Sequence, residues 1–170
     1  MVDSDVVQDT QIGVIDHHSA IIPMTKREKI EVIDRALLDL PQVECPIRNF
    51  FSDGLYAREM TIPAGTILTG AEHTTEHISI LSKGKLRMLR EGAPEDISAP
   101  FIVISRPGEK NAAYALEECV WTEFHPNPDK EQSMDVLVER HSTSKNSELL
   151  GGVENKQLIA NQNLLVETGG

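Results

Sequence analysis

The feature that most limits the fold of this chain is a series of short segments that recur about every ten residues after Pro46. Each segment is rich in β-branched or aromatic residues, and Gly or Pro separates it from the next. The segments lie near residues 54–62, 66–72, 76–82, 85–90, 101–105, 112–116 and 119–125. Short strands in succession favour an antiparallel sandwich or barrel rather than a parallel α/β sheet. The chain is therefore predicted to be mostly β.

One helix is predicted before these strands, over residues 25–40. Thr25 and Glu28 have the spacing of a capping box, and Pro41 ends the helical pattern. Its apolar residues recur at helical spacing, at Ile30, Ile33, Leu37 and Leu40. Among the strands, Ser82–Lys85 is predicted to form a hairpin turn with Gly84 at positive φ, and residues 91–95 a second turn.

The length of 170 residues indicates one domain, and the composition of the chain divides it into three parts. Residues 1–23 are expected to be a flexible acidic arm, residues 24–126 the folded core, and residues 127–170 an extension that is partly helical or disordered. With 16 Lys and Arg against 27 Asp and Glu, the net charge is −11, which argues against a nucleic-acid partner. No segment resembles a membrane span or a signal peptide, and two cysteines suit a reducing compartment, so we expect a cytoplasmic protein.

The segment from Ala71 to His77 carries the clearest chemical signal. Its His73-Thr-Thr-Glu-His77 string matches the H-x-x-E-H motif, in which a helix presents two histidines to a zinc ion. Many flanking β-branched residues, together with Gly65, Gly70 and Gly84, argue against a helix here. We therefore expect a strand and a bend instead.

The same segment resembles the first motif of the cupin superfamily, G-x5-H-x-H-x3-E-x6-G, over Gly65, His73, His77 and Gly84. The second cupin motif, P-x-G-x2-H, is echoed from Pro107 to Asn111. The resemblance implies a single antiparallel β-barrel of jelly-roll type, preceded by one α-helix and flanked by flexible extensions. The chain also resembles uncharacterised cupin-like proteins of tailed phages in four places: 54–58, 62–65, 76–78 and 114–121.

The metal positions implied by the cupin resemblance are only partly kept. The first His position is Ala71 and the second-motif His position is Asn111, whereas His73 is retained and His77 stands at the Glu position. Only two of the four usual metal positions keep a residue that can bind a metal, which does not support a full dioxygenase or oxalate-type centre. An enzymatic role is therefore left open, and a role without catalysis is favoured.

A smaller metal site can still be built from the histidines. A bend between His73 and His77 would bring the two rings together, and His125 is a possible third ligand on a later strand, on one face with Trp121 and Glu123. Such a set would suit Zn, Ni or Fe with an open position. The alternative is that the three histidines form hydrogen bonds in a polar cavity or in the core.

Other residues are candidates for ligand binding beside these histidines. Arg58 can clamp an anion or form an exposed ion pair, and Asn111 can bind a ligand or belong to a turn. Three residues carry amphipathic rings that suit a small polar ligand, with packing in the core as the alternative: Tyr56, Tyr114 and Trp121.

The leading functional hypothesis is a cupin-like protein that binds a small polar molecule, sugar-like or nucleotide-like, in a histidine-containing cavity. The first alternative is a metal-dependent isomerase, lyase or dioxygenase that uses His73, His77 and His125. The second is a structural or host-interaction protein, and the phage resemblance adds a role in sequestering a host molecule in the host cytoplasm. Because cupins commonly pair through their sheets, a homodimer or higher homo-oligomer is expected.

Overall fold

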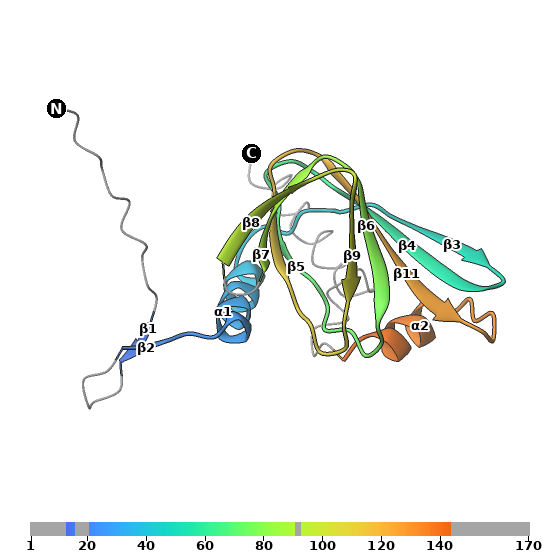
Figure 1. The fold of residues 1–170 in the computed structure, drawn as a ribbon, viewed down its shortest axis with the longest axis horizontal. Helices are drawn as coiled ribbons and strands as arrows, with labels where there is room; N and C mark the ends of the chain where they lie inside the picture. The colour runs from blue at the N-terminus through green and yellow to red at the C-terminus, as the bar shows by residue number, and fades with distance from the viewer. Residues whose placement is uncertain (1–12, 16–20, 91–92, 144–170) are drawn as a thin grey trace, which may run out of the picture.

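The computed structural model describes residues 13–15, 21–90 and 93–143, and these form two main antiparallel sheets, a separate two-stranded sheet and two helices (Figure 1). The larger sheet has the order β3 (Ile47–Ser52), β4 (Gly54–Ile62), β11 (Cys119–Asn127), β6 (His77–Lys83), β9 (Phe101–Ser105). The smaller has the order β5 (Ile67–Thr69), β10 (Ala112–Ala115), β7 (Lys85–Arg90), β8 (Ala93–Ser98). The helices are α1 (Lys26–Leu38) and α2 (Met134–His141). The mostly β architecture with one helix before the sandwich is confirmed.

All seven segments predicted as strands are strands. Four further strands of the described residues were not predicted, and two of these form a short pair before α1. The other two, β3 and β8, lie at the edges of their sheets. Most of their side chains are exposed, so neither has the alternation of apolar and polar residues that marks a half-buried strand. Because β8 begins at Ala93, the turn predicted over residues 91–95 was wrong from that residue onward; Pro94 is tolerated there because an edge strand can lack one donor.

The local signals read from the sequence are confirmed at α1 and at the turn after β6. Thr25 caps α1, and the reciprocal bonds between Thr25 and Glu28 complete the capping box. Gly84 joins β6 to β7 with a φ of 85°. A side chain at this position would collide with the Glu118 carbonyl group, so both the backbone conformation and the space require glycine.

The apolar core lies at one end of the space between the two sheets. The larger sheet contributes Ile62, Leu81 and Cys119, and the smaller sheet completes the buried cluster with Leu86, Met88, Ile97 and Ala115. We call the side of the larger sheet that faces this cluster its inner face and the opposite side its outer face. At the other end of the same space the inner face carries polar side chains.

The ends of the described chain add short elements to the sandwich. Within the predicted arm, β1 (Gly13–Ile15) pairs with β2 (Ile21–Pro23), and the rest of residues 1–20 lies outside the described residues. In the predicted extension, α2 buries Leu137, and residues 144–170 are not described. After α2 the backbone pairs with the loop before β6, through a bridge between Ser142 and His73. Within the described residues, no helix is both long and apolar enough to cross a membrane.

Candidate functional site

Three histidines meet at the polar end of the space between the sheets. His77 begins β6, and His125 lies beside it on β11 because Phe124 pairs with Ile78 in the ladder between these strands. His73 belongs to the loop before β6, which bends so that its ring lies 4.1 Å from the ring of His77. The ring of His125 lies 4.5 Å from that of His77 and 5.4 Å from that of His73. The loop and the two strands thus hold the rings as one cluster.

The three histidines form a group that could hold a metal ion. One ring nitrogen from each lies within 4.8 Å of those of the other two, a spacing that one ion with bonds of about 2 Å to nitrogen can bridge after a small adjustment. His77 and His125 are buried, and His73 is partly buried. Three nearby imidazoles make a metal ion plausible here.

The hydrogen bonds around the histidines leave ring nitrogens without partners. His73 Nδ1, His77 Nε2 and His125 Nδ1 are buried and have no hydrogen-bond partner among the described residues. His77 Nδ1 lies 3.3 Å from the Thr75 carbonyl oxygen, and since a carbonyl only accepts, this contact requires the proton on Nδ1. The lone pair of His77 is then on Nε2, the form in which imidazole binds a metal.

Burial keeps His77 uncharged. Loss of water around the ring, followed by repulsion from His73 and His125, lowers the pKa of His77 to about 4. A neutral imidazole is the form that donates a lone pair to a metal, so at neutral pH this ring does not first have to lose a proton.

Glu123 adds a carboxylate to the cluster from the same face of β11. Its side chain lies 3.6 Å from His73 Nε2, 3.8 Å from His125 Nε2 and 3.8 Å from the guanidinium of Arg58. Burial opposes ionisation, but the two histidines and the Arg58 charge hold the pKa of Glu123 well below its usual range. The group is therefore a carboxylate, able to act as a further oxygen ligand or to orient the histidines.

His141, at the end of α2, is a fourth histidine at the site, and the sequence analysis did not single it out. Its ring stacks on that of His125 at 4.6 Å, and its Nδ1 lies 3.3 Å from Thr75 Oγ1. Its buried Nε2 has no partner in the described part of the chain, and burial, with His125 nearby, lowers its pKa to about 4. The one available signal was its spacing four residues after Leu137, which places both on one face of a helix.

A cavity of about 260 Å³ opens beside the cluster. His73, His125 and Glu123 line its polar end, and its other walls come from α1, the loop before β3, β5 and α2. A second, smaller cavity of about 70 Å³ lies between the sheets and also reaches His73 and Glu123. His73 and Glu123 therefore line both cavities, and His125 lines the larger one.

The remaining predicted site residues have different positions. Tyr56 and Arg58 line the larger cavity, and the Tyr56 ring stacks on His125 at 6.0 Å. Trp121 and Asn111 line the smaller cavity; Trp121 also packs against the core, and Asn111 Oδ1 accepts a hydrogen bond from Lys26 Nζ at 2.7 Å. Tyr114 was placed wrongly at the cavity: it is exposed and lines neither one, because its β10 neighbour Ala115 takes the inward position.

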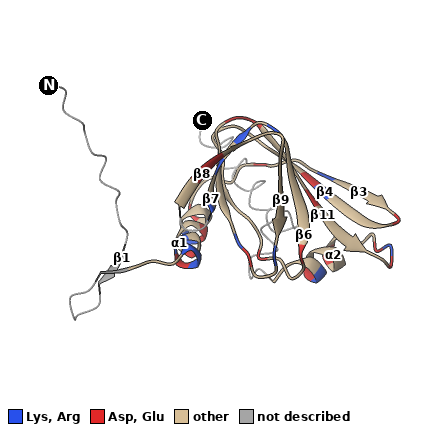
Figure 2. Cartoon of the chain, viewed as in Figure 1, with Lys and Arg blue, Asp and Glu red and all other residues tan. Residues whose placement is uncertain are grey.

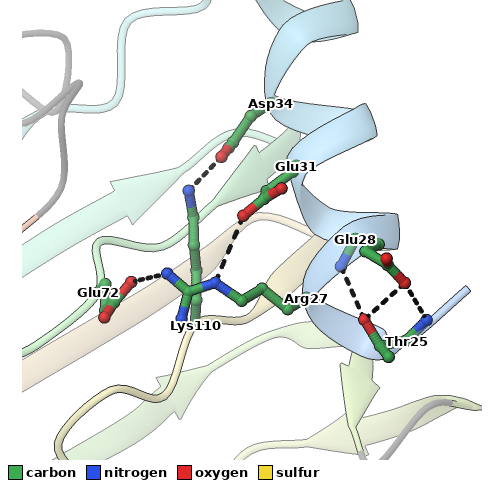
Figure 3. Close-up of polar contacts among 7 residues, drawn as sticks. All are labelled: Thr25, Arg27, Glu28, Glu31, Asp34, Glu72 and Lys110. Carbon is green, nitrogen blue, oxygen red and sulfur yellow. Dashed lines mark hydrogen bonds and ion pairs between the residues drawn. The ribbon is translucent and has the colours of Figure 1, made fainter.

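Polar contacts hold α1 in place as a wall of the larger cavity (Figure 3). Asp34 accepts from Lys110 and from Thr69, and Arg27 donates to Glu72 at 2.7 Å. Glu72 directly precedes His73, and Lys110 directly precedes Asn111. Hydrogen bonds therefore connect α1 to the two segments that resemble the cupin motifs, at Glu72 and at Lys110.

The motif positions lie where the cupin resemblance implies, with His73 and His77 on either side of the bend into β6 and Gly84 in the turn that follows. The sheets around them are antiparallel, and the chain crosses between the two sheets along its length. The fold is an antiparallel jelly roll. The phage likeness remains an expectation from the sequence.

Comparison with known proteins gives likenesses of fold only. No protein-family model matches the chain, and no curated protein matches its sequence. Among solved structures, KdgF from Halomonas sp. is 18% identical with a TM-score of 0.44, over 56% of this chain and 87% of that one. A cupin superfamily protein from Desulfitobacterium hafniense is 8% identical with a TM-score of 0.43, over 54% of this chain and 84% of that one.

An acetylacetone dioxygenase from Acinetobacter johnsonii is 14% identical with a TM-score of 0.41, over 54% of this chain and 74% of that one. At such identities and TM-scores, these likenesses say nothing about what this chain binds or converts. Its function has to be argued from its own residues.

Proposed function

We propose that this protein binds one divalent metal ion through His73, His77 and His125, and that the ion and the adjoining cavity together bind a small molecule. The observation that carries the proposal is the convergence of three ring nitrogens within 4.8 Å of one another. The larger cavity, which reaches His73 and His125, supplies the space for the second ligand.

The unpartnered nitrogens support a metal over a purely structural role for the histidines. A buried polar group without a partner costs about 1–3 kcal/mol, so a cluster of core histidines would be expected to satisfy its nitrogens within the protein. Here all three proposed ligands keep a buried ring nitrogen without a partner in the described residues. A metal ion would use lone pairs of this kind and remove that cost.

The donor set limits which metals fit. Imidazole nitrogens with a carboxylate nearby suit Zn, Ni or Fe, and the contact from His77 Nδ1 to the Thr75 carbonyl is the kind of outer contact that orients a metal-binding ring. With three protein ligands, such an ion offers an open position to an oxygen atom of a bound molecule. Arg58 lines the same cavity and can contact a polar or anionic group of that molecule.

The test is metal binding by the purified full chain after treatment with a chelator. Titration with Co²⁺, followed by its visible absorption, and elemental analysis after loading with Zn²⁺ should both give one ion per chain. His77→Ala and His125→Ala should each abolish binding, whereas Tyr114→Phe, at an exposed residue that lines neither cavity, should leave it intact. No bound ion, or an ion retained by both cluster variants, would refute the proposal.

A metal-dependent isomerase, lyase or dioxygenase would use the same three histidines. Formation of a product that depends on the metal and is lost in His125→Ala would distinguish such an enzyme from a binding protein. The sequestration of a host molecule in a phage-infected cell is a finer form of the binding role, and only the sequence resemblance supports it.

A further inference from the structure

The larger cavity has two chemically different halves. Its polar half is the end formed by His73, His125, Glu123 and Arg58. The other half is lined mainly by apolar side chains from α1, from the loop after it, from β5 and from α2, among them Leu38, Val43, Ile67 and Val138. A ligand that fills the whole cavity therefore meets polar groups at one end and hydrocarbon at the other.

The apolar half is not covered by the described part of the chain. Leu38 is 46% exposed, Val43 49% and Ile67 50%. Large apolar side chains that are exposed together around one cavity typically mark a binding surface rather than a part of the core. These side chains belong to three separate segments, and each segment turns one of them toward the same space.

The charges around the cavity favour an anion once a metal is present. The charged side chains that line it in the described structure are Asp34, Arg58, Lys110 and Glu123, which cancel in number. Lys110 pairs with Asp34, and Arg58 lies 3.8 Å from Glu123. A divalent ion bound by neutral histidines would leave an excess of positive charge at the polar end, and an anionic ligand would balance it.

We propose that the molecule bound here is a small amphipathic organic anion. Its carboxylate, or a similar oxygen anion, lies at the histidine end beside Arg58, and its apolar body lies against Leu38, Val43 and Ile67. The proposal rests on the metal centre of the proposed function for its anionic end. Its apolar end rests on the described side chains alone.

The experiment measures the binding of straight-chain carboxylates, from acetate to octanoate, to the full chain loaded with Zn²⁺, by calorimetry. Affinity should rise roughly fourfold for each added methylene group until the apolar half is filled. In the metal-stripped protein every acid should bind more weakly, but the increase with chain length should persist. Arg58→Gln should weaken all the acids by a similar factor.

Val43→Asp separates the two halves of the cavity. This variant should flatten the increase with chain length and leave both the affinity for acetate and the metal content unchanged. Val32→Asp is the matched control, since Val32 is similarly exposed on α1 but does not line the cavity, and it should behave as the unchanged protein.

The outcomes distinguish this inference from the proposed function. One bound Zn²⁺ per chain with no dependence on chain length would overturn the amphipathic ligand and leave the metal centre standing. Absence of metal with a persisting length dependence would refute the metal centre and the anionic end. A fall of several degrees in the melting temperature of ligand-free Val43→Asp, absent from Val32→Asp, would show that the chain itself covers this surface, and would also overturn the inference.

Discussion

At one end of the larger sheet, the two faces differ from what a sandwich usually shows. Strands of such a sheet normally turn apolar residues inward and polar residues outward. Here the inner face has His77 and Ser79 on β6 and Glu123 and His125 on β11, and only its far end is apolar. The outer face has Ile78 on β6, and Ile102 and Ile104 on β9, which are 65% and 58% exposed.

This difference indicates that the two faces serve purposes other than stability. A buried polar cluster weakens a fold unless something satisfies it, and an apolar outer surface is unfavourable in water unless something covers it. The core cluster, which includes Ile62 and Cys119, supplies the apolar contacts that hold the two sheets together. The polar end of the inner face is therefore not needed to hold them. Each face can therefore be tested without the other.

The largest expected effect comes from making the inner face apolar at His77. His77→Leu removes a proposed ligand, and the affinity for Zn²⁺ should fall by more than roughly a hundredfold, since loss of a supporting contact alone costs about 10–100-fold. The metal-free variant should be more stable than the metal-free parent by about 1 kcal/mol, because a buried unpartnered nitrogen is gone. Calorimetry and urea unfolding without metal measure both effects.

His77→Leu is informative in both directions. Lower stability of the metal-free variant would mean that His77 contributes to the fold itself, which would contradict the division between a binding end and a structural end. Tyr114→Phe is a suitable control, because Tyr114 is exposed and lies away from the cavities. It should change neither quantity.

The next largest effect is expected at the apolar end of the same inner face. Leu81 lies on β6, four residues after His77, and is fully buried in the core cluster. Leu81→Ala should lower the free energy of unfolding by about 2–5 kcal/mol, since it leaves a cavity among packed side chains. The folded variant should still bind one Zn²⁺ per chain in the titration used for the parent. Loss of both properties together would show that the two ends are coupled.

This contrast also explains how much the sequence could reveal. The seven strands predicted after Pro46, the capped helix α1 and the turn at Gly84 carry local signals, and these were predicted. The edge strands β3 and β8 were not, because most of their side chains are exposed and show no alternation, unlike those of the edge strand β9. Each of them pairs with the strand next to it in the sequence, β3 with β4 and β8 with β7, so what they lacked was a burial pattern and not a nearby partner.

The candidate site shows the same limit. The spacing of His73 and His77, with His125 on the proper face of β11, allowed three members of the cluster to be predicted. His141 could not be assigned to the cluster, because its position depends on how α2 packs against the loop before β6. Glu123 was placed on the same face as His125, but its distances to His73 and His125 could not be known from the sequence. Tyr114 was predicted to line the cavity but lies on the exposed face of β10. The sequence alone did not determine which face of the strand carries its side chain.

The third prediction concerns the outer face, for which we propose that a second copy of this chain is the partner. Ile78, Ile102 and Ile104 lie on paired strands, and β9 has no charged residue along its length (Figure 2). With a net charge of −11, two copies repel elsewhere, so an uncharged apolar face is where they can meet. Ile104→Glu should raise the dissociation constant of the dimer about tenfold or more. Light scattering after size exclusion measures it.

The metal content of Ile104→Glu should equal that of the parent, because the substitution lies on the outer face. If the parent chain is monomeric at all concentrations tested, the homodimer is refuted. If Ile104→Glu leaves a dimer unchanged, the dimer forms through another surface, and this face has a different role.

The smallest effect is expected at the opposite edge of the outer face, on β3. Arg48 on β3 pairs with Glu59 on β4, in an ion pair that leaves Arg48 mostly exposed. Because water and salt screen such a pair, Arg48→Ala should lower the free energy of unfolding by less than about 1 kcal/mol, as urea unfolding would measure. It should change neither dimer affinity nor metal content. A loss of the dimer comparable to that of Ile104→Glu would place the contact across the whole face, and would show that the charged edge takes part in it together with the isoleucines.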